Sequence, residues 1–441
     1  MNKFFNTIKN IFSIEELRTR ILNTLGFLII FRLGSFVVLP GIDPVLLKQF
    51  AGEASGIFGL LNTFLGGAFS RASVFALGIM PYISASIVIQ LLTVAVPYFS
   101  KLQKEGESGR KRLNQITRVL TIAITTAQAI SYLAVTIPSQ AIVVDPYIFQ
   151  ISSVIIIVAG TMFTMWLGER ITDKGIGNGI SMLIMIGIIS RLPAELVGEW
   201  LNKGLSGALF FVLEIVALFF VVMAVVMFTQ AVRRIPVQYA KQVVGGKVYG
   251  GQRQYIPLKV NSSGVMPIIF AQALMFLPPT LAGLFAEDSD IAVYIATVFA
   301  DYTSWQYNLL FGVLILVFTF FYTAITVNPT QIADDMKRNG GFVPGIKPGK
   351  HTAEFIDNIL TRITLPGSIF LAIVAIMPAF ASLAGVTPGF SQFYGGTSLL
   401  IMVGVILDTL QQIESYLLMR HYEGMMKSGR VKGRSQNVAV A

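Results

Sequence analysis

The feature that most constrains this chain is a succession of long apolar segments that carry almost no charge. Hydrophobic residues make up 54% of its 441 residues and charged residues only 13%, about half the charged share of a soluble domain. A run of about 20 apolar residues is long enough to cross a bilayer as a helix. We place ten such spans, at 21–40, 75–96, 116–137, 148–169, 179–193, 207–230, 262–284, 306–327, 365–385 and 395–418. The sequence therefore predicts an all-α polytopic membrane protein.

Charge is distributed unevenly between the connections of these spans. If the N-terminus and every second connection share one side, that side holds 27 of the 33 Lys and Arg residues and 10 acidic residues. The opposite side holds 4 basic and 9 acidic residues. Because Lys and Arg concentrate in cytoplasmic loops, both termini are expected in the cytoplasm. Residues 1–20 are expected to form an amphipathic surface helix, and residues 419–441 a basic tail.

The segment 56–97 has the pattern of a membrane helix broken in two. Its second half, from Phe75, is apolar enough to enter lipid, whereas the first half carries Gly66, Gly67, Ser70 and Arg71. Polar or irregular backbone at membrane depth is tolerated only where it is buried in protein or lines a water-filled cavity. This segment therefore predicts an aqueous path across the membrane.

Two connections on the basic side are long. Residues 231–261 contain six Lys and Arg and no acidic residue, with a predicted hairpin around Gly245-Gly246. Residues 328–364 read as a helix, a Gly/Pro turn and a second helix. Such basic loops can simply fix the topology, but six uncompensated charges favour docking of an anionic partner, either a nucleic acid or an acidic protein surface.

Signals of enzymatic chemistry are sparse. The chain has no cysteine, and His351 and His421 lack metal-ligand spacing. Residues 345–351 are too short for a phosphate-binding loop, so no cofactor is expected. Charge within the spans is also rare, which speaks against an ion-coupled secondary transporter with inverted repeats. That transporter is nevertheless kept as the alternative function, and a scaffold without a pore as a further one.

Several motifs closely resemble the SecY family of bacterial protein-conducting channels. They begin with Ser70–Ser86 (SRASVFALGIMPYISAS) and continue in family order from about residue 14 to 425. The remaining matching segments are 104–110, 160–169, 175–181, 257–261, 342–346 and 395–400.

The resemblance implies a fold and a function. Two pseudo-symmetric five-helix halves, 21–193 and 207–418, would surround a central pore closed by a plug helix, with an outer hinge loop at 194–206. Such a channel is not an enzyme: it moves unfolded preproteins across the bacterial plasma membrane and releases transmembrane segments sideways into the lipid. Expected partners are SecE, a SecG-like small subunit, the motor ATPase SecA, the translating ribosome with its rRNA, signal sequences and membrane lipid.

The resemblance also implies site residues. The pore constriction falls on six isoleucines, Ile83, Ile87, Ile184, Ile188, Ile269 and Ile406. The plug covers about 60–73, with Leu60, Asn62, Phe64, Gly66, Gly67, Phe69, Ser70 and Arg71. The lateral gate between spans two and seven includes Pro81, Ser86, Gln90, Gln128, Pro267 and Gln272. Docking of SecA or the ribosome falls on Arg233, Arg234, Lys241, Lys247, Arg253, Lys347 and Lys350.

The predicted constriction has a simple physical meaning. Isoleucines four residues apart share one face of a helix, and a ring of bulky apolar side chains excludes water and ions while it can still part around a chain. The glutamines in spans two, three and seven fit either ordinary interhelical hydrogen bonds or a polar seam that opens. One departure from the family is Lys347, where Arg is usual, because lysine lacks the planar fork of arginine.

Overall fold

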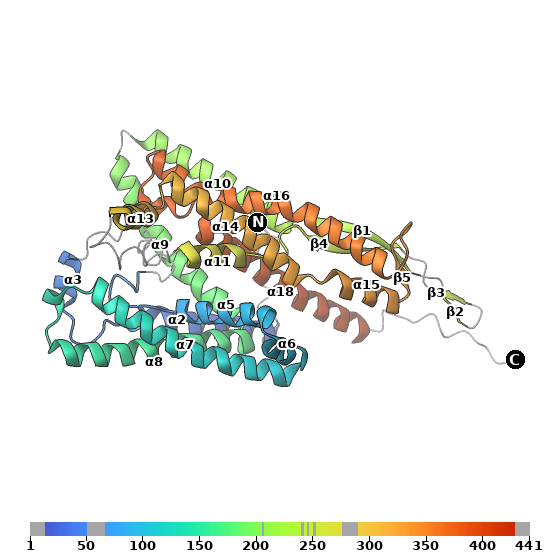
Figure 1. Ribbon diagram of the computed structural model, residues 1–441, viewed down its shortest axis with the longest axis horizontal. Helices are drawn as coiled ribbons and strands as arrows, with labels where there is room; N and C mark the ends of the chain where they lie inside the picture. The colour runs from blue at the N-terminus through green and yellow to red at the C-terminus, as the bar shows by residue number, and fades with distance from the viewer. Residues whose placement is uncertain are drawn as a thin grey trace.

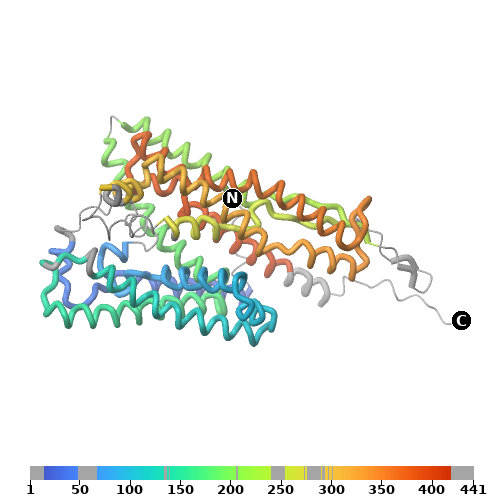
Figure 2. The backbone as a smooth tube through the Cα atoms, in the orientation of Figure 1, coloured from blue at the N-terminus to red at the C-terminus, as the bar shows by residue number. Residues whose placement is uncertain are grey.

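The computed structural model describes residues 14–50, 67–204, 207–239, 242–244, 247–249, 253–275 and 290–427. Within these residues the molecule is an elongated bundle of helices in two layers, with a small β-structure at one end (Figure 1). The chain completes one layer before it enters the other (Figure 2). The two layers correspond to the two halves expected from the sequence.

The first half extends to residue 203. Its elements are α2 (Glu15–Gly34), α3 (Pro44–Phe50), α5 (Met80–Ala95), α6 (Pro97–Lys104), α7 (Glu107–Thr136), the 3-10 turn η1 (Ser139–Ala141), α8 (Pro146–Lys174) and α9 (Gly179–Lys203). Side-chain caps begin the last two helices, where Asp145 and Asn178 each accept hydrogen bonds from two backbone N–H groups of the first turn. Such caps satisfy N–H groups that have no partner within the helix.

The second half contains the remaining helices and the strands. The helices are α10 (Ala208–Gln230), α11 (Met266–Met275), α13 (Asp290–Ala300), α14 (Trp305–Thr326), α15 (Pro329–Arg338), α16 (Lys350–Leu383), α17 (Pro388–Ser391) and α18 (Gly396–Lys427). The strands are β1 (Val232–Tyr239), β2 (Gln242–Val244), β3 (Lys247–Tyr249), β4 (Arg253–Lys259) and β5 (Gly341–Phe342).

The membrane-spanning helices agree with the predicted spans. Seven helices in the described part of the chain are long and apolar enough to cross a membrane, and the pair α5 and α6, bent by 99°, would make an eighth. Helix α2 and the described part of α11 occupy the positions of predicted spans one and seven. The ten-helix, two-half architecture predicted from the sequence is thus the architecture of the molecule.

The β-structure lies at the end where the cytoplasmic loops were expected. Strand β1 pairs antiparallel with β4 on one side and β5 on the other, with Ile235 opposite Ile256. Strands β2 and β3 form the hairpin predicted around residues 245–246. Ile235 and Val237 pack against Met336 and Ile356, so that the sheet shares an apolar core with α15 and α16. The helix, turn and helix expected over 328–364 correspond to α15, the residues between α15 and α16 that include β5, and the start of α16.

The expected outer loop at 194–206 is wrong for most of its length, because α9 continues to Lys203 and contains Pro193. Ion pairs at i,i+4 spacing support this extension: Arg191 with Glu195 at 2.5 Å, and Lys203 with Glu199 at 3.4 Å. The connection between the halves is therefore reduced to residues 204–207.

Other helix boundaries also differ from those predicted. Helix α5 begins at Met80, not at residue 75, and the described residues 67–79 before it form turns. Helix α2 begins at Glu15 and runs directly into the first span, so residues 15–20 are not a separate surface helix. Helix α18 continues to Lys427. Residues 1–13 and 428–441 lie outside the described residues.

Candidate pore and gate

A large apolar cluster lies where the two halves meet. It contains Ile83 and Ile87 of α5, Ile184 and Ile188 of α9, and partly buried Ile269 of α11 packs against it. Each pair is spaced i,i+4, so both members extend from one face of their helix. The structure thus brings five of the six predicted constriction residues into one cluster.

The sixth predicted residue, Ile406, is wrong. Its side chain is 42% exposed and lies outside this cluster, whereas Ile401 and Val405 of the same helix are buried within it. At 100° per residue, Ile406 points about 140° away from Ile401. The i,i+4 pair Ile401 and Val405 was the sequence signal that could have identified the correct face of α18.

The gate seam, as we call the contact of α5 with α11 and α14, is mostly apolar. Phe270 of α11 is buried in the same cluster as Ile83 and Ile87 of α5. On the α11–α14 side of the seam, its ring centroid lies 5.7 Å from that of Phe318 and 6.0 Å from that of Tyr322. Among the residues that the structure describes, one hydrogen bond crosses the seam: the Tyr322 hydroxyl donates to Oε1 of Gln90 over 3.4 Å. Sequence reasoning missed Phe270 and Tyr322, since neither belongs to a polar or isoleucine pattern.

The predicted gate residues have different surroundings. Pro81 and Pro267 are buried, and Ser86 accepts a 3.4 Å hydrogen bond from Nε2 of Gln90 on its own helix. Gln272 accepts a 3.0 Å hydrogen bond from Thr397 of α18. Gln128 is exposed on α7. Gln90, Gln128 and Gln272 therefore do not form one polar seam; Gln90 alone contacts the opposite half at the gate seam, and Gln272 ties α11 to its own half.

The described part of the predicted plug is fixed to the first half. The Tyr132 hydroxyl of α7 donates a 2.6 Å hydrogen bond to the carbonyl oxygen of Phe69, and Ser73 pairs with Val38 in a β-bridge. The Arg71 guanidinium lies 4.4 Å from the centroid of the Phe36 ring, a cation–π distance.

Of the other predicted plug residues, the structure describes only Gly67 and Ser70. Gly67 is buried and Ser70 half-buried, both in turns and not in the expected helix. Leu60, Asn62, Phe64 and Gly66 lie outside the described residues.

On the side of α9, polar contacts join the two halves; we call this contact the hinge seam. At one end, Oε2 of buried Glu199 on α9 accepts hydrogen bonds from the backbone N–H of Thr387, over 2.9 Å, and from its hydroxyl. Thr387 directly precedes α17. A charged acceptor makes these bonds stronger than neutral ones.

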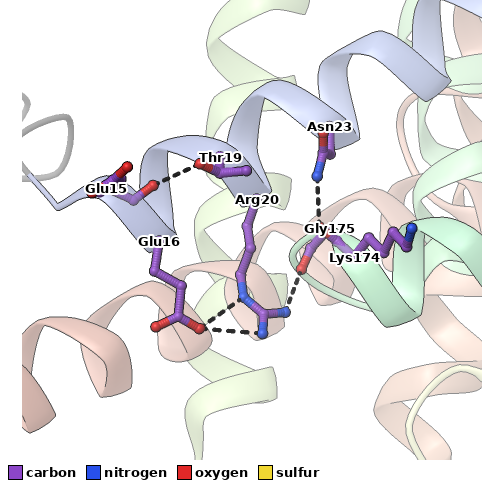
Figure 3. Close-up of polar contacts among 7 residues, drawn as sticks. All are labelled: Glu15, Glu16, Thr19, Arg20, Asn23, Lys174 and Gly175. Atoms are coloured by element: carbon purple, nitrogen blue, oxygen red, sulfur yellow. Dashed lines mark hydrogen bonds and ion pairs between the residues drawn. The ribbon is translucent and has the colours of Figure 1, made fainter.

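At the other end of the hinge seam, the turn between α8 and α9 contacts both halves. Arg20 and Asn23 of α2 donate to the carbonyl oxygens of Gly175 and Lys174, each over 3.3 Å (Figure 3). From the second half, Oε1 of Gln412 accepts a 2.8 Å hydrogen bond from the backbone N–H of Gly177. Both ends of this seam are thus held by directional polar contacts.

The predicted docking residues gather around the β-structure. Arg233 and Arg234 are exposed on β1, while Lys347 and Lys350 are exposed between β5 and the start of α16. Lys350 also lies 3.9 Å from Glu354. Lys247 and Arg253 belong to β3 and β4 by their backbone, and Lys241 lies outside the described residues. The strands and turn that carry these residues lie at one end of the molecule (Figure 1).

Among the described residues, no group of three or more His, Asp or Glu side chains could hold a metal ion.

The comparisons with known proteins agree with this geometry. The SecY family model matches residues 73–410. The protein translocase subunit SecY of Halalkalibacterium halodurans is 45% identical over 96% of this chain and all of the relative. That of Vibrio cholerae is 42% identical over 95% of this chain and 96% of the relative.

Solved structures share the fold. A protein-conducting channel has a TM-score of 0.62 at 17% identity, covering 90% of this chain and 92% of that chain. Sec61 in the canine ribosome-channel complex from the endoplasmic reticulum has a TM-score of 0.58 at 16% identity, with the same coverage. By the extent of the family match and the identity to its bacterial members, the chain belongs to the SecY family.

Proposed function

We propose that this chain is a protein-conducting channel that moves unfolded preproteins across the bacterial plasma membrane and is not itself an enzyme. The observation that carries this proposal is the apolar cluster at the meeting point of the two halves. Its aliphatic side chains have no donors or acceptors that would select a sequence, which suits a substrate of arbitrary sequence. Packed together, they would exclude water and ions from the path.

The constriction is proposed to include Ile83, Ile87, Ile184, Ile188 and Ile269, with Ile401 replacing Ile406. Helices from both halves contribute to the cluster, so a separation of the halves would widen it without unfolding any helix. Closure would restore the same apolar contacts, because packing of this kind needs no single hydrogen-bond geometry.

The gate seam is proposed as the sideways exit for signal sequences and transmembrane segments. Its two faces are joined mainly by apolar contacts, and lipid tails can replace such contacts at little cost. The single Gln90–Tyr322 hydrogen bond adds little, since a net contribution of about 1 kcal/mol is typical for an ordinary hydrogen bond.

A plug over residues 60–73 remains a proposal. The contacts of Phe69, Arg71 and Ser73 support an anchored end at residues 67–73. During transport, the part of the plug before Gly67 would then be the part that is displaced.

We also propose partners for this chain, on the basis of its likeness to the SecY family and of its charged loops. SecE and a SecG-like subunit would surround the bundle, and SecA or the translating ribosome would dock on the basic loops. Exposed Arg233, Arg234, Lys347 and Lys350 support docking of an acidic protein surface or rRNA. The excess of basic residues in the same loops supports cytoplasmic termini in the plasma membrane.

The test is transport by the purified chain, reconstituted with SecE and a SecG-like subunit in lipid vesicles. With SecA and ATP added, a preprotein should become protected from external protease only when its signal sequence is intact. A chain that moves small ions or solutes but no preprotein would contradict the proposal and favour a secondary transporter.

A further inference from the structure

A buried cluster of charges lies beside the connection between the two halves. Residues 204–207 are the single covalent passage from the first half to the second, and Lys203 is the last residue of α9. Its Nζ lies 3.4 Å from Oε1 of Glu199 and also contacts Oε1 of Glu214 on α10. Lys203 thus bridges one carboxylate from each side of the connection.

The three charged side chains are shielded from solvent. Their side-chain exposures are 0% for Glu199, 15% for Lys203 and 12% for Glu214. Taking charges out of water is costly, and only close pairing offsets that cost. Without Lys203, the two poorly hydrated carboxylates would face each other unpaired. A change in the spacing of α9 and α10 would likewise separate Lys203 from Glu214, so the cluster favours the present spacing.

The cluster also reaches across the hinge seam. Across it, Glu199 accepts hydrogen bonds from the N–H and the hydroxyl of Thr387. Within the second half, the Tyr394 hydroxyl donates to the backbone carbonyl oxygen of Glu214 over 2.7 Å. Burial, together with the carboxylates of Glu214 and Glu199, raises the pKa of the Tyr394 phenol and keeps it a donor. The Glu199 carboxylate and the Glu214 backbone are therefore both tied to the segment between α16 and α18, and Lys203 links the two carboxylates.

On the basis of the channel function proposed above, we propose that Glu199, Lys203 and Glu214 form a clamp that sets the resting angle between the halves and thereby the signal-sequence selectivity of the gate. We call these three residues the hinge clamp.

The position of the clamp explains how it would act. The halves can turn relative to each other most easily about their single covalent connection, while the gate seam lies between α5 and the helices α11 and α14. Hydrogen bonds weaken steeply when they are stretched or bent out of line, whereas the apolar gate contacts are less directional. The clamp would therefore resist rotation, and a signal sequence would supply the free energy to overcome that resistance.

The experiment compares transport of a preprotein with and without its signal sequence through the complete reconstituted complex. In Lys203→Met, the ratio of signal-less to normal transport should rise about tenfold, because breaking a buried ion pair is strongly destabilising. The double variant Lys203→Glu with Glu214→Lys should recover part of the original ratio, which a purely structural role would not do. Asn202→Ala, at an exposed neighbouring position, is the matched control and should leave the ratio unchanged.

Thr387→Val is the milder variant if Lys203→Met fails to fold. It removes the hydroxyl donor to Glu199 but keeps the backbone N–H, so the ratio should rise by a smaller factor. An unchanged ratio in the folded Lys203→Met or Thr387→Val complex would overturn the clamp. Absence of any preprotein transport by the unaltered chain would instead contradict the channel function, so the two failures are distinguishable.

Discussion

The two seams between the halves are built from different interactions. The gate seam joins α5 to α11 and α14 through Ile83, Ile87 and Phe270, with one long hydrogen bond. The hinge seam joins α9 and the turn before it to the second half through Glu199 with Thr387, and through Gly177 with Gln412. Apolar contacts tolerate sliding and exchange with lipid, whereas directional bonds hold a geometry. The proposed channel would need this difference to open at the gate seam and pivot at the hinge seam.

The largest effect on the closed state of the channel is expected when a polar side chain is introduced into the apolar cluster at the gate seam. Ile83→Asn places an amide in the cluster, where an unpaired polar group costs about 1–3 kcal/mol, and should raise the resting ion conductance of planar bilayers severalfold. Val88→Asn is the matched control, because Val88 of the same helix is 40% exposed. Equal conductance in the two variants would show that the apolar cluster is not the seal.

A smaller effect is expected at the end of the hinge seam formed by the turn between α8 and α9. Gln412→Leu leaves the N–H of Gly177 without its acceptor, at a cost of about 1–3 kcal/mol. Gly177 is buried, so water has little access to the freed N–H. Transport of a signal-less preprotein should rise, and Gln411→Leu, an exposed neighbour, should not change it. A rise in both variants would point to a general loss of stability.

The smallest effect is expected from the polar contact of the gate seam. Tyr322→Phe removes the 3.4 Å hydrogen bond to Gln90 but keeps the ring that packs near Phe270. Because the bond is long and single, resting conductance and signal selectivity should stay within about twofold of the unaltered chain. A change as large as that of Ile83→Asn would mean that hydrogen bonding, not apolar packing, holds the gate closed.

Much of this arrangement could be predicted from the sequence. Ten apolar spans set the fold. The family resemblance pointed to the isoleucine pairs of α5 and α9, and their i,i+4 spacing places both members of each pair on one helix face. The prediction failed at Ile406, since matching by motif gives the helix but not reliably its rotation, and an error of five residues turns the side chain away from the cluster.

The hinge seam could not be found in this way. Glu199 and Thr387 are 188 residues apart, and Gly177 and Gln412 are 235 residues apart. Contacts between residues so far apart in the sequence leave no periodic pattern from which they could be predicted. The resemblance implied a loop at 194–206, whereas charged residues within 194–203 form ion pairs that stabilise the end of α9.

The central claim, that the gate seam opens while the hinge seam holds, can be tested by distances measured across both. The chain has no cysteine, so spin labels can be attached to introduced pairs at exposed positions. Leu91 with Phe321 spans the gate seam, and Leu201 with Leu383 spans the hinge side. With a preprotein arrested in the channel, we predict a longer distance for the Leu91–Phe321 pair and an unchanged one for the Leu201–Leu383 pair. Equal lengthening of both distances, or lengthening of the second alone, would contradict the account.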